Sequence, residues 1–294
     1  LETVAADSNS DRYSLMIKFD KYVEGQNYHG MSKLALNNMI SDYTQMRDAI
    51  TYDMCKYLGL PASLYNYAKI TKHGEYFGCY LALEPVDKIF CERNFGSELG
   101  ALYNPVEYGS SGGNLNYIDD NEDSYPEIFD NSEFGSNKKS REAVIKSLKA
   151  VSEGKNLEDY VNVDNILKYL ALQSVVVNWD SLTGHAGHNN FLYLKNGKLS
   201  LIPWDFNLAY GLYMDDGEED LDINEEQLKE LLGDDSIDLE KLSEEEFDAL
   251  FAKLEQGNED EEYEVDYQKQ TSLYVNFPID TPFLGDISKR QFFM

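Results

Sequence analysis

Three polar residues near the middle of the chain have the types and the spacing of a metal-dependent phosphoryl-transfer site. Asp180, Asn189 and Asp205 flank two apolar-rich runs that meet at Asn196-Gly197. Carboxylate and amide oxygens suit Mg²⁺, which commonly takes one or two protein ligands and leaves its other positions to phosphate and water. Phosphoryl transfer also needs a carboxylate near the acceptor hydroxyl. These residues therefore predict a magnesium-dependent phosphoryl-transfer site.

The pair Asn196-Gly197 predicts a two-residue hairpin turn, because a type I′ turn needs positive φ at both positions. The turn sets the register of the hairpin, in which the residues next to the turn pair and Asn189 faces Trp204. Asp205 then lies diagonally beside Asn189, on the side where Asp180 follows an apolar helix. We therefore expect the three polar residues at the open end of one hairpin.

The order Asp, Asn, hairpin, Asp-Phe is that of a protein-kinase active site, with Asp205-Phe206-Asn207 as its last part. Two features depart from the usual kinase pattern. Asn189 follows Asp180 by nine residues instead of five, and Asn207 stands where Gly is usual. Asn and Asp are also ordinary turn and capping residues, so a structural role is the alternative.

Histidine and cysteine give weaker signals. His185 and His188 form an H-x-x-H pair that could bind zinc, but neither a cysteine nor a third histidine lies close by in the sequence, so a hydrogen-bonding role is the alternative. The three cysteines, Cys55, Cys79 and Cys91, cannot all pair, so one disulfide is possible and none is required.

Composition excludes several classes of protein. The apolar share of 42% rules out a disordered chain, and no uncharged apolar run approaches the ~20 residues of a membrane helix. The formal net charge of −29 argues against nucleic acid or an anionic membrane as the main partner. Residues 215–266 hold 24 acidic and 3 basic residues, so most of this charge belongs to one segment.

Residue periodicity predicts the elements that carry the site. The first 85 residues indicate a small α+β unit, with strands over 12–19 and 28–38, a helix from Asp42 to Leu58, and a hairpin of 65–71 and 76–83 that turns at Gly74. Residues 96–137 are rich in Gly and Asp and predict a long connection with short elements. Apolar positions from 138 onward, and over 163–177, predict a helical second half.

The sequence resembles the spore-coat H (CotH) kinase family of atypical secreted or coat-associated protein kinases. The matching blocks occur in the family's order and span most of residues 11–211. They are Ser14 to Phe19, Lys33 to Asn38 with Asp42, Gly78 to Glu84, Gly100 to Pro105, Asn178-Trp179-Asp180-Ser181, His188-Asn189 with Leu192-Tyr193, and Ile202-Pro203-Trp204-Asp205. Val275 to Asp280 resembles a further block near the C-terminus.

The resemblance implies an atypical bilobal protein-kinase-like fold of the α+β class, with a small antiparallel-sheet N-lobe and a mainly helical C-lobe. Residues 1–294 would then form a single kinase domain. Its expected parts are an N-lobe at about 11–95, a connection and C-lobe core with the catalytic hairpin at about 96–214, an acidic insertion at 215–268, and the start of a C-terminal part at 269–294.

The resemblance also implies cofactors and acceptors. ATP with Mg²⁺ or Mn²⁺ would be bound between the lobes, and the acceptors would be Ser or Thr of coat or envelope proteins, at a bacterial cell surface or spore coat. Asp180 would be the catalytic-loop aspartate, and Asn189 and Asp205 would hold the metal. The family's usual Leu-Tyr-Lys-Pro has Asn104 in place of the Lys, and no G-x-G-x-x-G loop precedes Lys33.

Two further residues are implied to bind the nucleotide. Lys33 matches the family's Lys in the strand before the first helix and would hold the phosphates. Glu84 ends the strand that leads to the expected hinge and would bond ribose or adenine. The alternatives are a solvated surface lysine for Lys33 and the beginning of the following helix for Glu84.

Other functions remain open from the sequence. A surface binding or adhesion module would keep the fold without the chemistry, and a related phosphotransferase would act on a small molecule or carbohydrate. The acidic segment 215–266 predicts a solvated insertion with short amphipathic helices, and the alternative is a site for a basic protein substrate or loosely held Ca²⁺.

Overall fold

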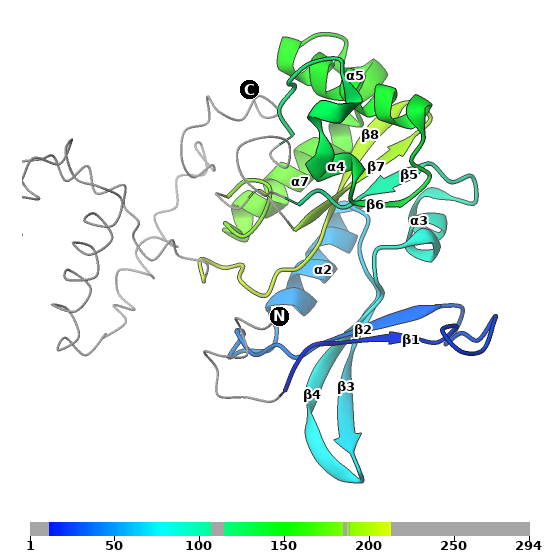
Figure 1. Cartoon of the computed structure of the whole chain (residues 1–294). Coiled ribbons are helices and arrows are strands. Elements are labelled where there is room, and N and C mark those ends of the chain that lie inside the picture. Colours follow the sequence, from blue (N-terminus) through cyan, green and yellow to red (C-terminus); the bar gives the residue numbers. More distant parts are fainter. Residues whose placement is uncertain (1–11, 107–114, 185–186, 188, 213–294) are drawn as a thin grey trace, which may run out of the picture. The chain divides into compact units, whose positions relative to one another are not determined.

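The computed structural model describes residues 12–106, 115–184, 187 and 189–212 of the 294-residue chain. This part is a mixed α/β structure with two four-stranded antiparallel sheets (Figure 1). The predicted combination of helices with antiparallel strands is confirmed. The acidic segment 215–266, the block at 275–280 and the pair His185 and His188 lie outside the described residues.

The first sheet has the strand order β1-β2-β4-β3 and comes entirely from the N-terminal third of the chain. Its strands are β1 (Leu15–Lys18), β2 (Lys33–Asn37), β3 (Tyr65–Lys72) and β4 (Glu75–Leu83). β3 and β4 form the predicted hairpin, in which His73 and Gly74 have φ of 55° and 88°. β1 and β2 are shorter than predicted, because residues 19–32 between them form bends and turns.

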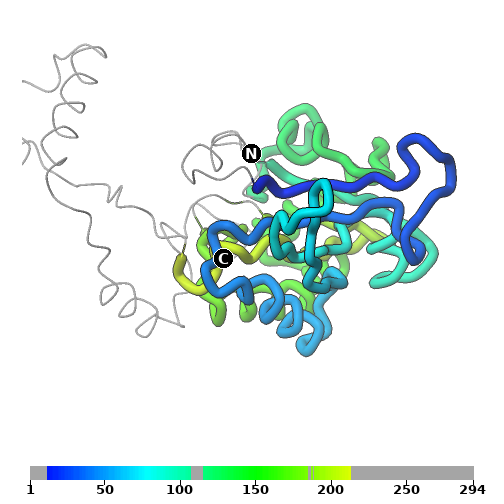
Figure 2. Tube along the Cα trace, turned by 90° about the horizontal axis from the view of Figure 1, so that it is seen from below, coloured from blue at the N-terminus to red at the C-terminus, as the bar shows by residue number. Residues whose placement is uncertain are grey.

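Helix α2 (Arg47–Leu58) connects β2 to β3 and is the medium-blue coil in Figure 2. Asp42, the predicted cap, lies outside the helix, but its Oδ2 accepts the Arg47 backbone N–H at 2.8 Å. This bond satisfies one of the amide groups that a helix leaves unpaired at its N-terminus. Gly59 ends the helix with φ of 75°, a conformation that glycine adopts without strain.

The second sheet lies in the second half of the described chain, where helices still hold more residues than strands. It has the order β6-β5-β7-β8, so the predicted hairpin is extended by two strands from the region expected to be a connection. Its strands are β5 (Ala101–Tyr103), β6 (Ser132–Phe134), β7 (Asn190–Lys195) and β8 (Lys198–Pro203). β5 and β6 have three residues each, which is too short for an alternating pattern to stand out.

Six further helices belong to the described residues. α3 (Lys88–Phe95) lies between the two sheets in the chain, and η1 (Glu122–Ser124), α4 (Pro126–Phe129), α5 (Lys138–Glu153), α6 (Leu157–Tyr160) and α7 (Val163–Val175) belong to the second half. The Asn165 side chain of α7 accepts the Leu201 backbone N–H at 2.7 Å and donates to the Leu201 carbonyl at 3.1 Å, which fixes β8 on α7. In the described part of the chain, no helix is both long and apolar enough to cross a membrane.

The predicted hairpin register is confirmed. Lys195 pairs with Lys198 across the turn, and Asn196 and Gly197 have φ of 53° and 77°. At the open end, the Trp204 N–H donates to the Asn189 carbonyl at 3.2 Å. The two-residue turn therefore places Asn189 opposite Trp204, as its geometry requires.

The contact between β5 and β7 gives a stability prediction at Gly100. A Cβ added there would lie 1.8 Å from the Leu194 carbonyl oxygen, so Gly100→Ala must displace β5 from the sheet. We expect a loss of about 3 kcal/mol in the free energy of unfolding, at the upper end of typical overpacking costs, measured by urea denaturation. Gly74→Ala is the control: it meets nothing within 4 Å and should cost about 1 kcal/mol for its positive φ. Equal losses in the two variants would contradict the prediction.

Candidate active site

Asp180 and Asn189 are in direct contact. The Asn189 Nδ2 donates to both the Oδ2 and the carbonyl oxygen of Asp180, each at 2.8 Å. Asp180 is buried, and Asn189 has φ of 57°, which Asn tolerates better than most residues. Two residues that are nine positions apart thus form one unit between α7 and β7.

The chain around Asp180 folds into a tight loop. The Ser181 Oγ donates to the Asn178 carbonyl at 2.7 Å, and the Gly184 N–H donates to the Ser181 carbonyl at 3.0 Å. A Cβ added at Gly184 would lie 1.4 Å from the Trp179 carbonyl oxygen. Only glycine leaves room for the Trp179 carbonyl at this position. The loop therefore fixes the backbone on both sides of Asp180.

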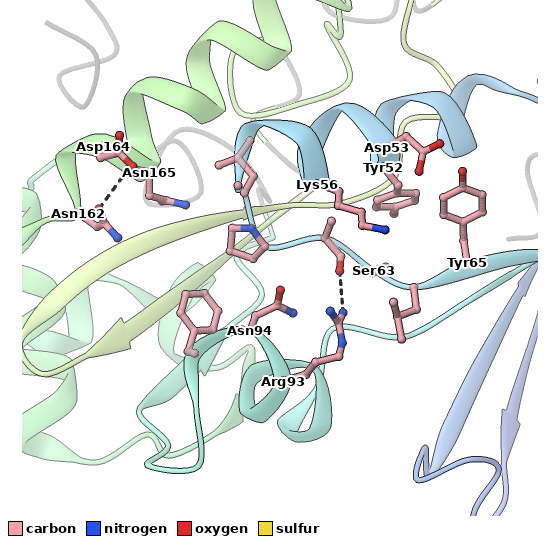
Figure 3. A pocket seen from close by; sticks show the side chains of 16 residues that line it. Tyr52, Asp53, Lys56, Ser63, Tyr65, Arg93, Asn94, Asn162, Asp164 and Asn165 are labelled. Atoms are coloured by element: carbon pink, nitrogen blue, oxygen red, sulfur yellow. Dashed lines mark hydrogen bonds between the residues drawn. The ribbon is translucent and has the colours of Figure 1, made fainter.

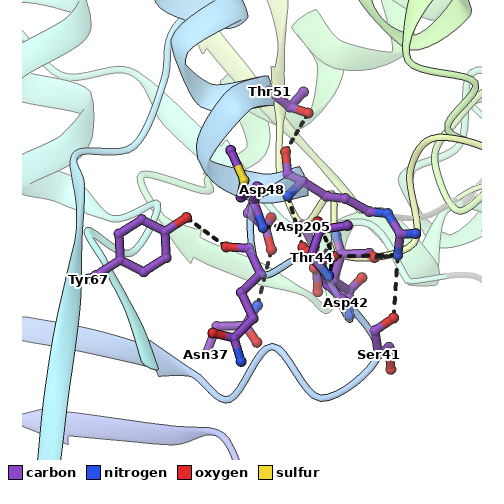
Figure 4. A network of polar contacts seen from close by, with 12 residues as sticks. Asn37, Ser41, Asp42, Thr44, Asp48, Thr51, Tyr67 and Asp205 are labelled. Carbon is purple, nitrogen blue, oxygen red and sulfur yellow. Dashed lines mark hydrogen bonds and ion pairs between the residues drawn. The ribbon is translucent and has the colours of Figure 1, made fainter. Parts of the chain in front are cut away.

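Asp205 follows β8 and lies beside two segments from the first part of the chain (Figure 4). The next residue, Phe206, donates its backbone N–H to the Asp48 Oδ1 at 2.8 Å. The other oxygen of Asp48 accepts from the Asn37 Nδ2 at 3.4 Å. Asp205 has φ of 56°, so its backbone adopts the sparsely populated left-handed region.

Arg47 connects the start of α2 to the same segment. Its guanidinium lies 3.7 Å from the Asp42 carboxylate and donates to the Asn207 carbonyl at 3.5 Å. Asp42 in turn accepts the Thr44 N–H at 2.9 Å. The first turn of α2 therefore contacts the chain on both sides of Phe206.

Burial changes the protonation of two α2 side chains at this site. It raises the pKa of Asp48 to about 8, with the nearby Asp205 carboxylate as the second cause, although the Phe206 N–H opposes the change. Burial, followed by the charges of Asp48 and Asp205, also raises the pKa of Tyr52 well above its usual value. The two carboxylates thus resist being ionised together.

A cavity of about 270 Å³ opens beside Asp205. Its apolar walls include Met16, Ala35, Leu83 and Trp204. Asn37 and Asp205 add polar groups to the lining. The Asp48 carboxylate accepts hydrogen bonds from the Asn37 side chain and from the backbone N–H of Phe206, the residue after Asp205. An apolar wall with a few polar groups is typical of a small-molecule site. The carboxylate oxygens of Asp205 suit a divalent cation whose other ligands are phosphate oxygens.

Lys33 does not lie beside Asp205. It shares a sheet face with Ala35 and Asn37, but it begins β2 and is therefore about 13 Å along the strand from Asn37. Its neighbour in the antiparallel register is Lys18, a like charge. Binding of nucleotide phosphates by Lys33 stays a prediction, and Asn37 is the β2 residue next to the Asp48 carboxylate.

The Glu84 carboxylate has a structural role. Its buried carboxylate forms an ion pair with Arg93 of α3 and accepts the Leu64 N–H at 3.1 Å. This ion pair fixes the end of β4 to the beginning of β3 and to α3. A contact of Glu84 with ribose or adenine stays a prediction.

A second, larger cavity of about 630 Å³ contains none of the predicted site residues (Figure 3). It is lined by α2 residues that include Lys56, by Arg93 and by the start of α7. Tyr52 borders it and also packs edge-on against the Phe206 ring, with centroids 5.1 Å apart.

The donors at the site fit Mg²⁺ only as part of a complex with phosphate. Within the described residues, no three His, Cys, Asp or Glu side chains are close enough to form a metal cage. A carboxylate and an amide oxygen, as predicted for Asp205 and Asn189, are what Mg²⁺ takes when phosphates complete its shell, and their joint binding of one metal stays a prediction. The three cysteines are free, and Cys55 and Cys91 are buried.

The sequence interpretation missed Asp48 and assigned no role to Asn37. A polar residue at the first turn of a helix is ordinary, because acidic groups favour helix N-termini. The only available signal was that Asp48 lies on the apolar side of α2, with Tyr52 and Cys55 one and two turns later. A carboxylate on a buried helix face requires a partner.

Sequence comparisons relate the chain to a protein family and to two known proteins. The family model described as "CotH kinase protein" matches residues 5–271. Inner spore coat protein H of Bacillus subtilis (strain 168) is 24% identical over 203 residues, which cover 65% of this chain and 53% of that protein. Invasin CotH7 of Rhizopus delemar is 24% identical over 206 residues, which cover 65% of this chain and 33% of that protein. The chain thus spans about half or less of these relatives.

The raised pKa of Asp48 predicts a pH-dependent stability. Between about pH 4 and pH 8 the folded state keeps a proton that the unfolded state releases, so stability present at low pH is lost as the pH rises through this range. Each tenfold difference in proton affinity corresponds to about 1.4 kcal/mol. In metal-free buffer, the unfolding free energy of the wild type should therefore fall relative to that of Asp48→Asn from pH 5 to pH 8, measured by urea denaturation. Parallel pH profiles would contradict this assignment.

Proposed function

Because the chain belongs to the CotH kinase protein family, we propose that it is an atypical protein kinase that transfers the γ-phosphate of ATP to Ser or Thr of protein acceptors. The observation that carries this proposal is the position of Asp205 on a cavity whose other walls are mostly apolar. The apolar wall suits a nucleotide base, and the Asp205 side suits its phosphates with Mg²⁺ or Mn²⁺. The first sheet with α2, and the second sheet with its helices, would be the two lobes of a kinase-like fold.

Asp180 would orient the acceptor hydroxyl and accept its proton. Two hydrogen bonds from the Asn189 Nδ2 fix the carboxylate and the backbone of Asp180, and the Gly184 N–H closes the loop on the Ser181 carbonyl. Positioning of this kind is the main contribution of a protein to phosphoryl transfer.

Asn189 and Asp205 would hold the divalent metal together with phosphate oxygens. The Asn189 Nδ2 is committed to Asp180, so the amide oxygen is the atom left for a metal. When bound, the metal neutralises the charge of the nucleotide phosphates. Because one relative is a spore-coat protein, we propose coat or envelope proteins as acceptors.

Asp205→Asn tests the nucleotide site. Asn tolerates the positive φ at this position, so the variant removes the charge without adding strain. For the wild type, ATP with Mg²⁺ or Mn²⁺ at a hundredfold excess over Kd should stabilise the fold by about 2.7 kcal/mol, seen as a higher melting temperature. Asp205→Asn should lose this metal-dependent increase, and Asp120→Asn, an exposed residue paired with Lys149, should keep it. No increase for the wild type at millimolar nucleotide would favour the binding module instead.

Asp180→Asn separates chemistry from binding. The variant should keep the melting-temperature increase with ATP and metal, because Asp180 lies on the acceptor side of the proposed site. Phosphate transfer, followed with radiolabelled ATP and a Ser/Thr-containing acceptor, should fall by about 100-fold or more, as expected for loss of a general base. Transfer at the wild-type rate would exclude the proposed role of Asp180.

A further inference from the structure

The Asp48 carboxylate joins three segments that are far apart in the sequence. It lies in the first turn of α2 and is 3% exposed. One oxygen accepts the backbone N–H of Phe206, the residue after Asp205, and the other accepts the side-chain Nδ2 of Asn37 at the end of β2. Asp48 is thus a direct connection from the first sheet to the segment that carries the proposed metal ligand.

The bond to Phe206 controls the backbone of Asp205. A peptide group is planar, so the N–H of Phe206 and the carbonyl of Asp205 move together. A hydrogen bond that holds this N–H therefore restricts ψ of Asp205, whose φ of 56° already costs about 1 kcal/mol or more. The second restraint on this segment is the Phe206 ring, which packs on Tyr52 of α2, the helix that also carries Asp48.

The bond to Asn37 has a defined direction. The Asn37 Oδ1 accepts the Met39 N–H at 2.9 Å, so its Nδ2 is the atom that faces Asp48. Asn37 also lines the cavity beside Asp205, on the same strand face as Ala35. A molecule bound in this cavity therefore touches the strand that Asp48 holds.

Stability alone does not account for a carboxylate at this position. Burying a carboxyl group is costly, because it must either keep a proton at neutral pH or ionise beside the Asp205 carboxylate. An apolar side chain of similar size would avoid both costs. In protein kinases, a Lys of the strand before this helix and a Glu of the helix itself must pair for activity. Asn37 and Asp48 have the same order in the chain and form a hydrogen bond in which the donor is neutral.

We propose that Asp48 is a positioning residue that couples binding of the nucleotide beside β2 to the placement of Asp205 for the metal. The coupling runs through the Asn37 side chain, the Asp48 carboxylate and the Phe206 amide. Asp48 acts through these groups and not by binding the metal itself. This proposal rests on the proposed nucleotide site and assigns a regulatory connection within it.

An exchange of the two side chains tests the connection. Asp48→Asn keeps an oxygen for the Phe206 N–H but turns an amide nitrogen toward the Asn37 nitrogen, and Asn37→Asp sets two carboxylates against each other. The double exchange restores the bond, because the new amide at 48 donates to the new carboxylate at 37 while both retain their bonds to Phe206 and Met39. Asp53→Asn, on the exposed side of α2, is the matched control.

Binding of Mn²⁺ would be measured by electron paramagnetic resonance, with and without a non-hydrolysable ATP analogue. Each single variant should weaken Mn²⁺ binding in the presence of the analogue by about tenfold, the upper end of what one ordinary hydrogen bond contributes. The double exchange should recover most of this loss, and Asp53→Asn should match the wild type. Thermal melting without ligand establishes that each variant is folded.

The possible outcomes separate the two proposals. Absence of Asp205-dependent Mn²⁺–nucleotide binding in the wild type would overturn both the proposed function and the coupling. Wild-type binding with unaffected single variants would overturn the coupling alone. Where a single variant does not fold, the folded double exchange decides: wild-type affinity supports the coupling, and lost affinity overturns it.

Discussion

The structure around the candidate site depends on holding Asp205 in a backbone conformation that it would not choose by itself. Helix α2 supplies most of the restraint. Its first turn contacts the chain after β8 through Asp48 and Arg47, and Tyr52 one turn later packs on the Phe206 ring. The helix also supports the first sheet, since Tyr52 and Cys55 belong to the same core as Leu81 and Leu83 of β4. One element thus connects the sheet beside the cavity with the segment that carries the metal ligand.

Asp180 and Asn189 are positioned by different means. Their direct bond makes them independent of α2, and their surroundings come from α7, the tight loop at Gly184 and the β7–β8 hairpin. The hairpin is fixed to α7 by both hydrogen-bonding groups of the Asn165 side chain. The acceptor part of the site is therefore rigid through local contacts, while the metal and nucleotide part depends on contacts between distant segments.

This division explains which features the sequence could predict. The register of the hairpin follows from two turn residues, so Asn189 opposite Trp204 was a local prediction, and the structure confirms it. The pairing of Asp48 with Phe206 spans 158 positions, and no periodicity in α2 encodes it. The ion pair of Glu84 with Arg93 was missed for a different reason: Glu84 was interpreted only as the end of a strand, and Arg93, nine positions later, was assigned no role. β5 and β6 were not recognised because three-residue strands carry almost no pattern.

The balance of charge at the site favours joint binding of nucleotide and metal. Asp42, Asp48 and Asp205 gather around the start of α2, and the nearest described cation, Arg47, is already paired with Asp42. The β2 residue beside them is the neutral Asn37, and Lys33 lies at the other end of the strand. A polyphosphate alone would meet net negative charge here, and a divalent cation alone would lack enough ligands. A metal–nucleotide complex removes both problems, because phosphate oxygens complete the metal shell and the metal screens the phosphates from Asp205.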